Sequence, residues 1–166
     1  MSEPAILNPT PALTAKAIIA VLRKNHEPPQ YAFFEELRCG TGATPGADAD
    51  QRLDAWCINC WPMHRLARTA YEVKISRADY LLELKHPRKR RRALLLSNLF
   101  YFVAPKGLLR EDELPVEAGL IEVLPDDYGY LRAHTRVQAP WRDTPMPNWQ
   151  FVANLARLAA TNARRP

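Results

Sequence analysis

The strongest constraint on the fold comes from the run Arg68–Ala104, whose pattern predicts a strand, a helix and a second strand. Residues Arg68–Ile75 alternate apolar and polar side chains with the period of two that is typical of a half-buried strand. Ser76 then opens a capping-box pattern, and we expect a helix from there to about Lys85. Leu99–Ala104 is apolar throughout, which is typical of a fully buried strand. The run therefore predicts an α/β fold.

The rest of the chain supplies elements on both sides of this run. Cys39–Asp50 is rich in Gly, Ala, Thr and Asp and is expected to be a loop. In chain order we expect helix, strand, strand, strand, helix, strand, strand and helix, which predicts a mixed central sheet flanked by helices. The other expected elements are a helix from Thr14 to about Asn25, a short helix running into a strand over Tyr31–Arg38, a strand over Arg52–Asn59, a helix resuming over Arg88–Leu96 after Pro87, strands over Gly119–Leu124 and Tyr128–Val137, and a helix over Trp149–Arg164 capped by Asn148.

Length and composition suit one domain. The chain has 166 residues, of which 47% are hydrophobic, and this is enough for one sizeable core. We expect a flexible lead over residues 1–12, a core over 13–125 and a C-terminal extension over 126–166. No uncharged apolar stretch approaches the roughly 20 residues that span a bilayer, so we expect no membrane partner. Three cysteines, an odd number, and no signal-like start predict a reducing, cytoplasmic setting.

Charge is unevenly distributed along the chain. The net charge is +5, but residues 52–92 hold eleven Lys and Arg against only four acids, whereas residues 107–128 hold one Arg against seven acids. A basic segment of this kind indicates a phosphate-binding surface. That surface does not explain why the same segment keeps carboxylates, so its four acids require a reason of their own. They are Asp54, Glu72, Asp79 and Glu83.

Two of these acids lie on neighbouring predicted strands. If the strands form a hairpin that turns near Pro62, Asp54 and Glu72 lie near the same end and project to one face. Two close carboxylates repel unless a proton or a cation joins them, and the carbonyl of Val73 lies between them. This oxygen set suits Mg²⁺ or Mn²⁺. Lys74 shares the face of Glu72 and can stabilise charge that develops on a phosphate, as metal-assisted phosphodiester hydrolysis requires. A single Glu-x-Lys on a strand is, by contrast, commonly a solvated ion pair.

The residues around this set resemble the PD-(D/E)XK nuclease superfamily, in the branch that contains MmcB-type DNA repair proteins. The resemblance runs from Phe33 to Val123, over half of the chain. It rests on the segments FFEELRCGTG, RLDAW, YEVKISRADYLLELKHPRKRRRALLLSNLFYFVAP and GLIEVL.

This resemblance implies a restriction-endonuclease-like α-β-β-β-α-β core and Mg²⁺-dependent cleavage of nucleic acid. It implies that Asp54 and Glu72 bind the metal and that Lys74 positions or activates the attacking water. Many members add an acid from the first helix or its exit. The predicted first helix holds no acid before its end, so Glu36 or Glu35 is the best match.

A run of cations follows the predicted site. One interpretation is that the run neutralises nucleic-acid phosphates, which would make binding sensitive to salt. The alternative is a solvated helix face. Five consecutive cations repel one another, which favours nucleic-acid contact. The run and its extension comprise Lys85, Arg88, Lys89, Arg90, Arg91 and Arg92, and Ser76 caps the helix near the site. Three aromatic residues, Trp56, Trp61 and Tyr80, would stack on bases if exposed, although core positions suit them better.

Two other motifs compete with this interpretation. Cys57 and Cys60, followed by His64 and with Cys39 nearby in the sequence, have the residue types of a zinc site. Cys57 falls within a predicted apolar strand, however, where a thiol behaves as a small hydrophobe. Residues 40–42, Gly-Thr-Gly, lack the downstream Lys of a phosphate loop and are expected to be a flexible loop that borders the site.

The sequence thus supports three hypotheses. The first is a metal-dependent nuclease that hydrolyses DNA in repair or recombination, with RNA left open as a substrate. The second is a catalytically inactive nucleic-acid-binding module on the same fold. The third is a scaffold stabilised by zinc. A homodimer is compatible with each.

Overall fold

The computed structural model describes residues 13–39 and 51–163, which form one six-stranded sheet with helices on both sides. The elements agree closely with the expected order. Three short 3₁₀ turns, at Pro62–His64, Pro87–Arg90 and Glu111–Glu113, join some of them. The main elements are α1 (Ala15–Lys24), β1 (Tyr31–Arg38), β2 (Arg52–Asn59), β3 (Arg68–Val73), α2 (Arg77–Leu84), α3 (Arg91–Leu96), β4 (Leu99–Pro105), β5 (Gly119–Pro125), β6 (Leu131–Val137) and α4 (Trp149–Asn162).

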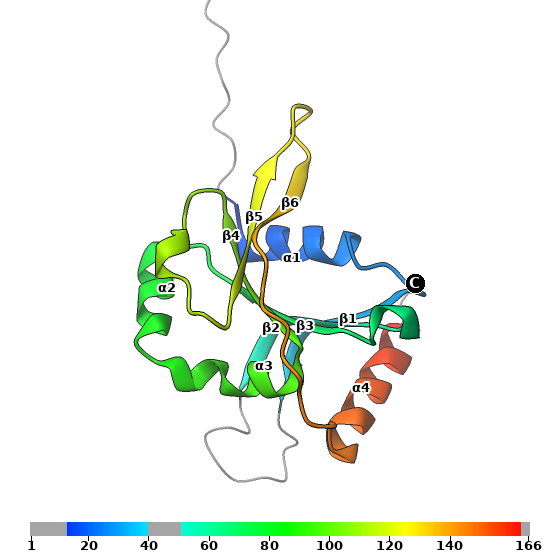
Figure 1. The fold of residues 1–166 in the computed structure, drawn as a ribbon. Coiled ribbons are helices and arrows are strands. Elements are labelled where there is room, and N and C mark those ends of the chain that lie inside the picture. Colours follow the sequence, from blue (N-terminus) through cyan, green and yellow to red (C-terminus); the bar gives the residue numbers. More distant parts are fainter. Residues whose placement is uncertain (1–12, 40–50, 164–166) are drawn as a thin grey trace, which may run out of the picture.

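The sheet is mixed, and its strands follow one another in chain order from β1 to β6. Strands β1, β2 and β3 pair antiparallel, β3, β4 and β5 pair parallel, and β6 pairs antiparallel to β5. Helices α2 and α3 form the crossover between β3 and β4 (Figure 1). Parallel neighbours require such a crossover, and this one begins directly after β3. The start of α2 therefore lies close to the end of β3.

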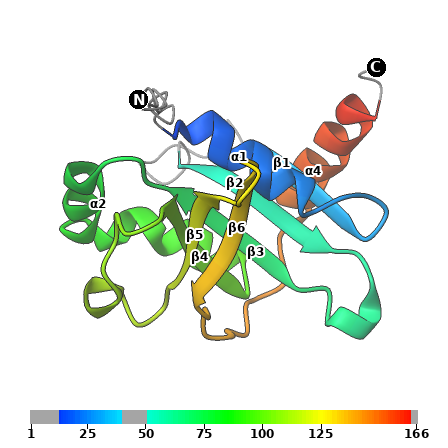
Figure 2. The same cartoon turned by 90° about the horizontal axis from the view of Figure 1, so that it is seen from above.

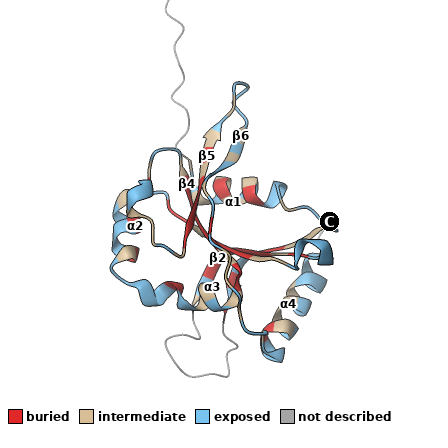
Figure 3. Cartoon of the chain, viewed as in Figure 1, coloured by how far each residue is buried: buried red, intermediate tan, exposed pale blue. Residues whose placement is uncertain are grey.

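Helices cover both faces of the sheet and divide the core into two clusters. On one face Ile18 and Leu22 of α1 pack with Tyr71 and Val103 of the sheet. The other face packs with α2, α3 and α4, whose buried contributions include Tyr80, Ala93 and Phe151. Figures 1 and 2 show α1 on one side of the sheet and α4 on the other. In Figure 3, the red that marks buried residues lies mostly on the strands between these helices.

Side-chain caps begin three helices at the positions that the sequence predicts. The side chain of Thr14 accepts a hydrogen bond from the backbone N–H of Ala17, and Ser76 accepts one from Asp79. Asn148 caps α4 in the same way. Each cap satisfies one of the N–H groups that a helix start leaves without an intrahelical partner.

The prediction of a helix at the start of Tyr31–Arg38 is wrong, because the whole segment is strand β1. Phe33 packs into the α1-side cluster, whereas Phe34 packs into the cluster on the opposite face. Only an extended chain sends adjacent side chains to opposite faces of a sheet, so burial of both rings overrides the helical spacing of the segment.

Two strands are shorter than the sequence predicts. Strand β3 ends at Val73 rather than at Ile75, and β6, an edge strand of the sheet, begins at Leu131 rather than at Tyr128. Between residues 13 and 39 and between 51 and 163, no helix has the length and apolar character needed to cross a membrane.

Candidate active site

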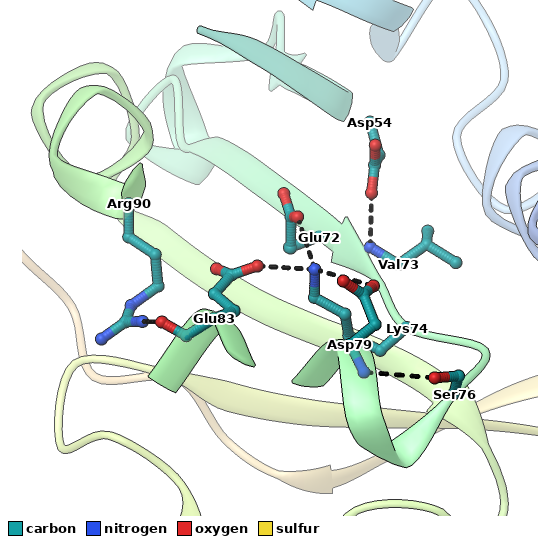
Figure 4. A network of polar contacts seen from close by, with 8 residues as sticks. All are labelled: Asp54, Glu72, Val73, Lys74, Ser76, Asp79, Glu83 and Arg90. Atoms are coloured by element: carbon teal, nitrogen blue, oxygen red, sulfur yellow. Dashed lines mark hydrogen bonds and ion pairs between the residues drawn. The ribbon is translucent and has the colours of Figure 1, made fainter. Parts of the chain in front are cut away.

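Lys74, just beyond the end of β3, is surrounded by three carboxylates. Its Nζ lies 2.5 Å from Oε2 of Glu83, 3.0 Å from Oε1 of Glu72 and 3.3 Å from Oδ2 of Asp79. Figure 4 shows these side chains converging on the ammonium group from β3 and α2. Lys74 and Glu83 are each only 5% exposed. One cation is thus shared by three acids, and two members of the group are buried.

The turn between β3 and α2 creates this convergence. The backbone N–H of Lys74 donates to the carbonyl of Val103 on β4, which holds Lys74 at the sheet although β3 has ended. The Ser76 cap then begins α2 and places Asp79 in its first turn. Glu83 follows four residues later, so it lies above Asp79 on the same side of the helix. Strand end, cap and helix period together direct both acids toward Lys74.

Asp54 lies at an irregularity in the β1–β2 ladder. The pairing is regular on either side but skips Glu36 and Asp54, which stand opposite each other. Glu36 has φ 48°, in the left-handed region that residues with a side chain rarely adopt. Phe34 and Leu37, three residues apart, enter the same core cluster, so the faces of the strand exchange here. Strain of this kind clusters at functional sites, and here it lies at a predicted catalytic residue.

The same irregularity brings Asp54 to β3. The β2–β3 ladder ends at the pair of Ala55 and Tyr71, and beyond it the Oδ2 atom of Asp54 accepts the backbone N–H of Val73 at 2.8 Å. The carboxylate replaces the carbonyl that a continuing strand would offer. Asp54 therefore approaches β3 at the residue between Glu72 and Lys74, as the hairpin argument expected.

Burial and mutual repulsion shift the pKa values of these acids upward. Burial raises the pKa of Glu72 to about 8, and the charges of Asp54 and Glu83 contribute to the rise. Burial also raises the pKa of Asp54, against the opposing hydrogen bond from Val73. For Lys74, burial alone would lower the pKa, but the charge of Glu72 and the contact with Glu83 outweigh it and the pKa is raised. The site has more negative charge than Lys74 alone can balance.

A cleft of about 680 Å³ opens above these groups. Glu72, Lys74 and Glu83 line it, together with the exposed cations Arg52, Arg88 and Lys89. Carboxylates and one ammonium group thus lie beside a rim of positive charge. This arrangement suits a ligand that carries phosphate, because the rim attracts the phosphate while the acids can hold a hard cation next to it.

The basic run does not act as one surface, which corrects the prediction for Arg90. Its side chain is buried, its Nη2 lies 3.1 Å from Oε1 of Glu117, and its Nη1 donates to the carbonyl of Glu83. The five-cation run includes a 3₁₀ turn before α3 begins, and this geometry turns Arg90 inward. The remaining cations of the run are half-buried or exposed: Lys85, Arg88, Lys89, Arg91 and Arg92.

The third acid remains a prediction from the resemblance. Glu36 is exposed and lies 3.7 Å from Arg52, whereas Glu35 pairs with Arg23 of α1 at 2.7 Å. Neither contacts the Lys74 group in the described residues. Glu36 instead lines a second groove, which it shares with Asp54.

The residues of the zinc hypothesis are not gathered. Cys57 is buried against the hydroxyl of Tyr71, Cys39 belongs to the core cluster on the other face, and Cys60 is exposed. In the described part of the chain no group of three or more His, Cys, Asp and Glu side chains has the geometry of a metal site. Residues 40–42 lie outside the described residues. Of the three aromatic residues considered for base stacking, Trp56 and Tyr80 are buried in the core. The third, Trp61, is 41% exposed.

Sequence reasoning missed two members of the site, Asp79 and Glu83. A signal for Glu83 exists, since it lies three residues after Tyr80 and so shares the apolar face of α2. An acid on the buried face of a helix requires a partner, and Lys74 is that partner. All four acids of the basic segment therefore occupy one site.

Comparisons with models of protein families, with curated proteins and with solved structures found no match to this chain.

Proposed function

We propose that this chain is a Mg²⁺-dependent nuclease that hydrolyses phosphodiester bonds, with DNA as its substrate. One observation carries the proposal. In a segment that is otherwise basic, three of the four acids contact Lys74 at the wall of a cleft whose rim is cationic, and the fourth, Asp54, accepts the backbone N–H of the residue next to Lys74. A purely structural ion pair requires one acid for one lysine, and it gives no reason for Asp54, Glu72, Asp79 and Glu83 to collect there.

The donor set fits a hard divalent cation. Asp54 and Glu72 offer carboxylate oxygens of the kind that such a cation prefers. Burial raises the pKa of both groups, and their mutual repulsion adds to the rise for Glu72, so a bound cation would offset the cost of ionising them. We propose these two residues as the metal ligands, with the Val73 carbonyl as a third candidate. When bound, the metal would lower the pKa of a water molecule and polarise the phosphoryl oxygens.

Lys74 has a different role from the ligands. Because its pKa is raised, it stays protonated at neutral pH and acts as a hydrogen-bond donor rather than as a base. Glu72, Asp79 and Glu83 fix the position of the ammonium group. A preorganised cation of this kind stabilises the negative charge that develops on a phosphoryl oxygen in the transition state. Arg52, Arg88 and Lys89 would bind the flanking phosphates and hold the substrate over the site.

The fold gives independent support. The order α1, β1, β2, β3, α2, β4 follows the α-β-β-β-α-β core that the resemblance implies, with an antiparallel β1–β2–β3 meander and a parallel β4. We propose that this is a restriction-endonuclease-like core. The irregular pair of Glu36 and Asp54 then lies where that core would carry its catalytic acids.

Cleavage by the purified full chain tests the proposal. Single-stranded, duplex and branched DNA and RNA are incubated with Mg²⁺, with Mn²⁺ and with a chelator. We expect cleavage that requires the metal and that is lost in Asp54→Asn. If the wild-type protein binds DNA in a salt-sensitive manner but cleaves none of the substrates with either metal, the inactive binding module is the better account.

A further inference from the structure

A second groove lies on the other side of Asp54 from the cationic cleft. It has a volume of about 1030 Å³ and runs between α1, strand β1 and the end of α4. Much of its lining is apolar or aromatic and includes Ile19, Tyr31 and Phe33. Tyr31 is half-buried and packs edge-on against His26, so its ring is held in place. The groove is thus a preformed surface with rigid rings.

The cations of this groove come from α1, whereas its acids, Glu27, Glu35, Glu36 and Asp54, come from the segment after α1 and from β1 and β2. The helix carries three cations and no acid, and all three, Lys16, Arg23 and Lys24, are exposed and line the groove. Arg23 is paired with Glu35 at 2.7 Å, whereas Lys16 and Lys24 have no ion-pair partner among the described residues. The α1 side of the groove, with these two cations next to aromatic walls, matches a chain of bases joined by phosphates, and the acids lie on the β1 and β2 side.

The groove adjoins the candidate active site at Asp54. Asp54 and Glu36 line the groove, and Asp54 bonds to the residue between Glu72 and Lys74, which line the cationic cleft. A ligand that occupies both must therefore pass over Asp54. The cleft and the groove differ in chemistry, because charged side chains line most of the cleft whereas the groove also has apolar surface.

We propose that this groove binds an unpaired strand of nucleic acid, so that the enzyme acts on single-stranded DNA or on a single-stranded branch. This inference rests on the proposed function and specifies its substrate class. In a duplex the bases are stacked on each other and paired inward, and only sugar and phosphate meet the protein along the backbone. Unpaired bases can turn toward Ile19 and Tyr31 while Lys16 and Lys24 contact the phosphates.

The test measures binding without cleavage, using fluorescence anisotropy of a labelled single-stranded oligonucleotide and of its duplex in chelator. We expect the wild-type protein to bind the single strand at least about tenfold more tightly, as stacking of bases on protein rings allows. Tyr31→Leu should weaken single-strand binding by about fivefold or more. Lys24→Gln should lower the slope of log affinity against log salt by about 0.7, the value for one phosphate contact on a single strand.

The matched control is Arg132→Gln, which removes the same charge from the β5–β6 hairpin, outside both grooves. It should leave the salt slope unchanged. Lys24 is exposed, so Lys24→Gln keeps the test valid even if Tyr31→Leu reduces stability. Equal affinity for duplex and single strand, or an equal effect of Lys24→Gln and Arg132→Gln, would overturn the inference. Groove-dependent single-strand binding without any metal-dependent cleavage would leave the inference standing and remove the proposed function.

Discussion

Two groups of ion pairs in this molecule join basic side chains to carboxylates under opposite conditions. Around Lys74, the side chains of Lys74 and Glu83 are 6% and 7% exposed. At the acidic segment after β4, Arg110 pairs with Asp112 at 2.7 Å and Arg136 pairs with Glu111, and all four side chains are more than half exposed. The Lys74–Glu83 pair is enclosed by protein, and the second group is in water.

The difference in solvent determines what each group does. Arg110 holds the pKa of Asp112 below its ordinary value, whereas burial raises the pKa of Glu72. Exposed ion pairs contribute about 0–1 kcal/mol to stability, whereas removal of one partner from a buried pair leaves a desolvated charge. The Lys74 group is thus costly to maintain, and this cost is what distinguishes a candidate site from an ordinary solvated pair.

The largest effect is expected from Lys74→Met. The change leaves Glu72, Asp79 and Glu83 facing one another without their shared cation. We expect the free energy of unfolding to fall by about 3 kcal/mol at pH 8, the lower range for breaking a buried pair. Denaturant titration measures it. The control is Arg110→Met, which likewise removes the cation of a pair, but of an exposed one. An equal loss of unfolding free energy in the two variants would contradict the distinction between the groups.

Arg90 and Arg91 sharpen the comparison because they are adjacent in the sequence. Arg90 is buried against Glu117, whereas Arg91 is exposed. Arg90→Gln should lower the free energy of unfolding by about 2 kcal/mol, since Glu117 loses its partner. Arg91→Gln should change stability by less than about 0.5 kcal/mol and should instead weaken DNA binding. A stability loss of the same size in both would contradict the burial of Arg90.

Stability should also depend on pH in the direction set by Glu72. Its pKa is about 8 in the folded protein and near 4.5 in the unfolded chain, so the folded state binds more protons between these values. Stability in chelator should therefore fall as pH rises from about 4.5 to 8. Glu72→Gln should remove much of this slope.

Asp112→Asn provides the control for that measurement. Because the folded pKa of Asp112 is lowered, its contribution is present at neutral pH and is lost only as pH falls below about 4. The slope between pH 4.5 and 8 should stay as in the wild type. An equal slope in the wild type and in Glu72→Gln would mean that Glu72 does not take up its proton in this window.

The smallest effect is expected at the exposed pairs themselves. The double variant Arg110→Gln, Asp112→Asn should unfold at the same temperature as the wild type, because both side chains are well exposed. A double-mutant cycle from thermal unfolding measures the coupling between them. A coupling as large as that between Lys74 and Glu83 would contradict the distinction between the exposed pair and the buried group.

Much of the fold follows from local signals in the sequence. The caps at Thr14, Ser76 and Asn148 and the strands of the central run were predicted, because capping and period-two alternation depend on neighbouring residues. The start of β1 was predicted wrongly, since burial on both faces of the sheet, rather than local spacing, decides its conformation.

The site was predicted only in part. The pair Glu72 and Lys74 follows from the strand period, and the approach of Asp54 follows from the hairpin. The burial of Glu83 is indicated only by its place on the apolar face of α2, and the burial of Arg90 depends on how the 3₁₀ turn packs on the sheet, which no local pattern of charge reveals. The left-handed backbone of Glu36 is likewise set by the tertiary structure, because the faces of β1 exchange there.

The central claim is that Glu72 belongs to a hydrolytic centre rather than to a structural ion pair. Single-turnover cleavage of single-stranded DNA in Mg²⁺ by Glu72→Gln tests it most directly, with Glu111→Gln as the matched change at an exposed acid. We predict that Glu72→Gln slows cleavage by at least about 10²-fold while it remains folded, because a ligand that supports electrostatic stabilisation is lost. Glu111→Gln should cleave at the wild-type rate. Wild-type cleavage by folded Glu72→Gln would contradict the account.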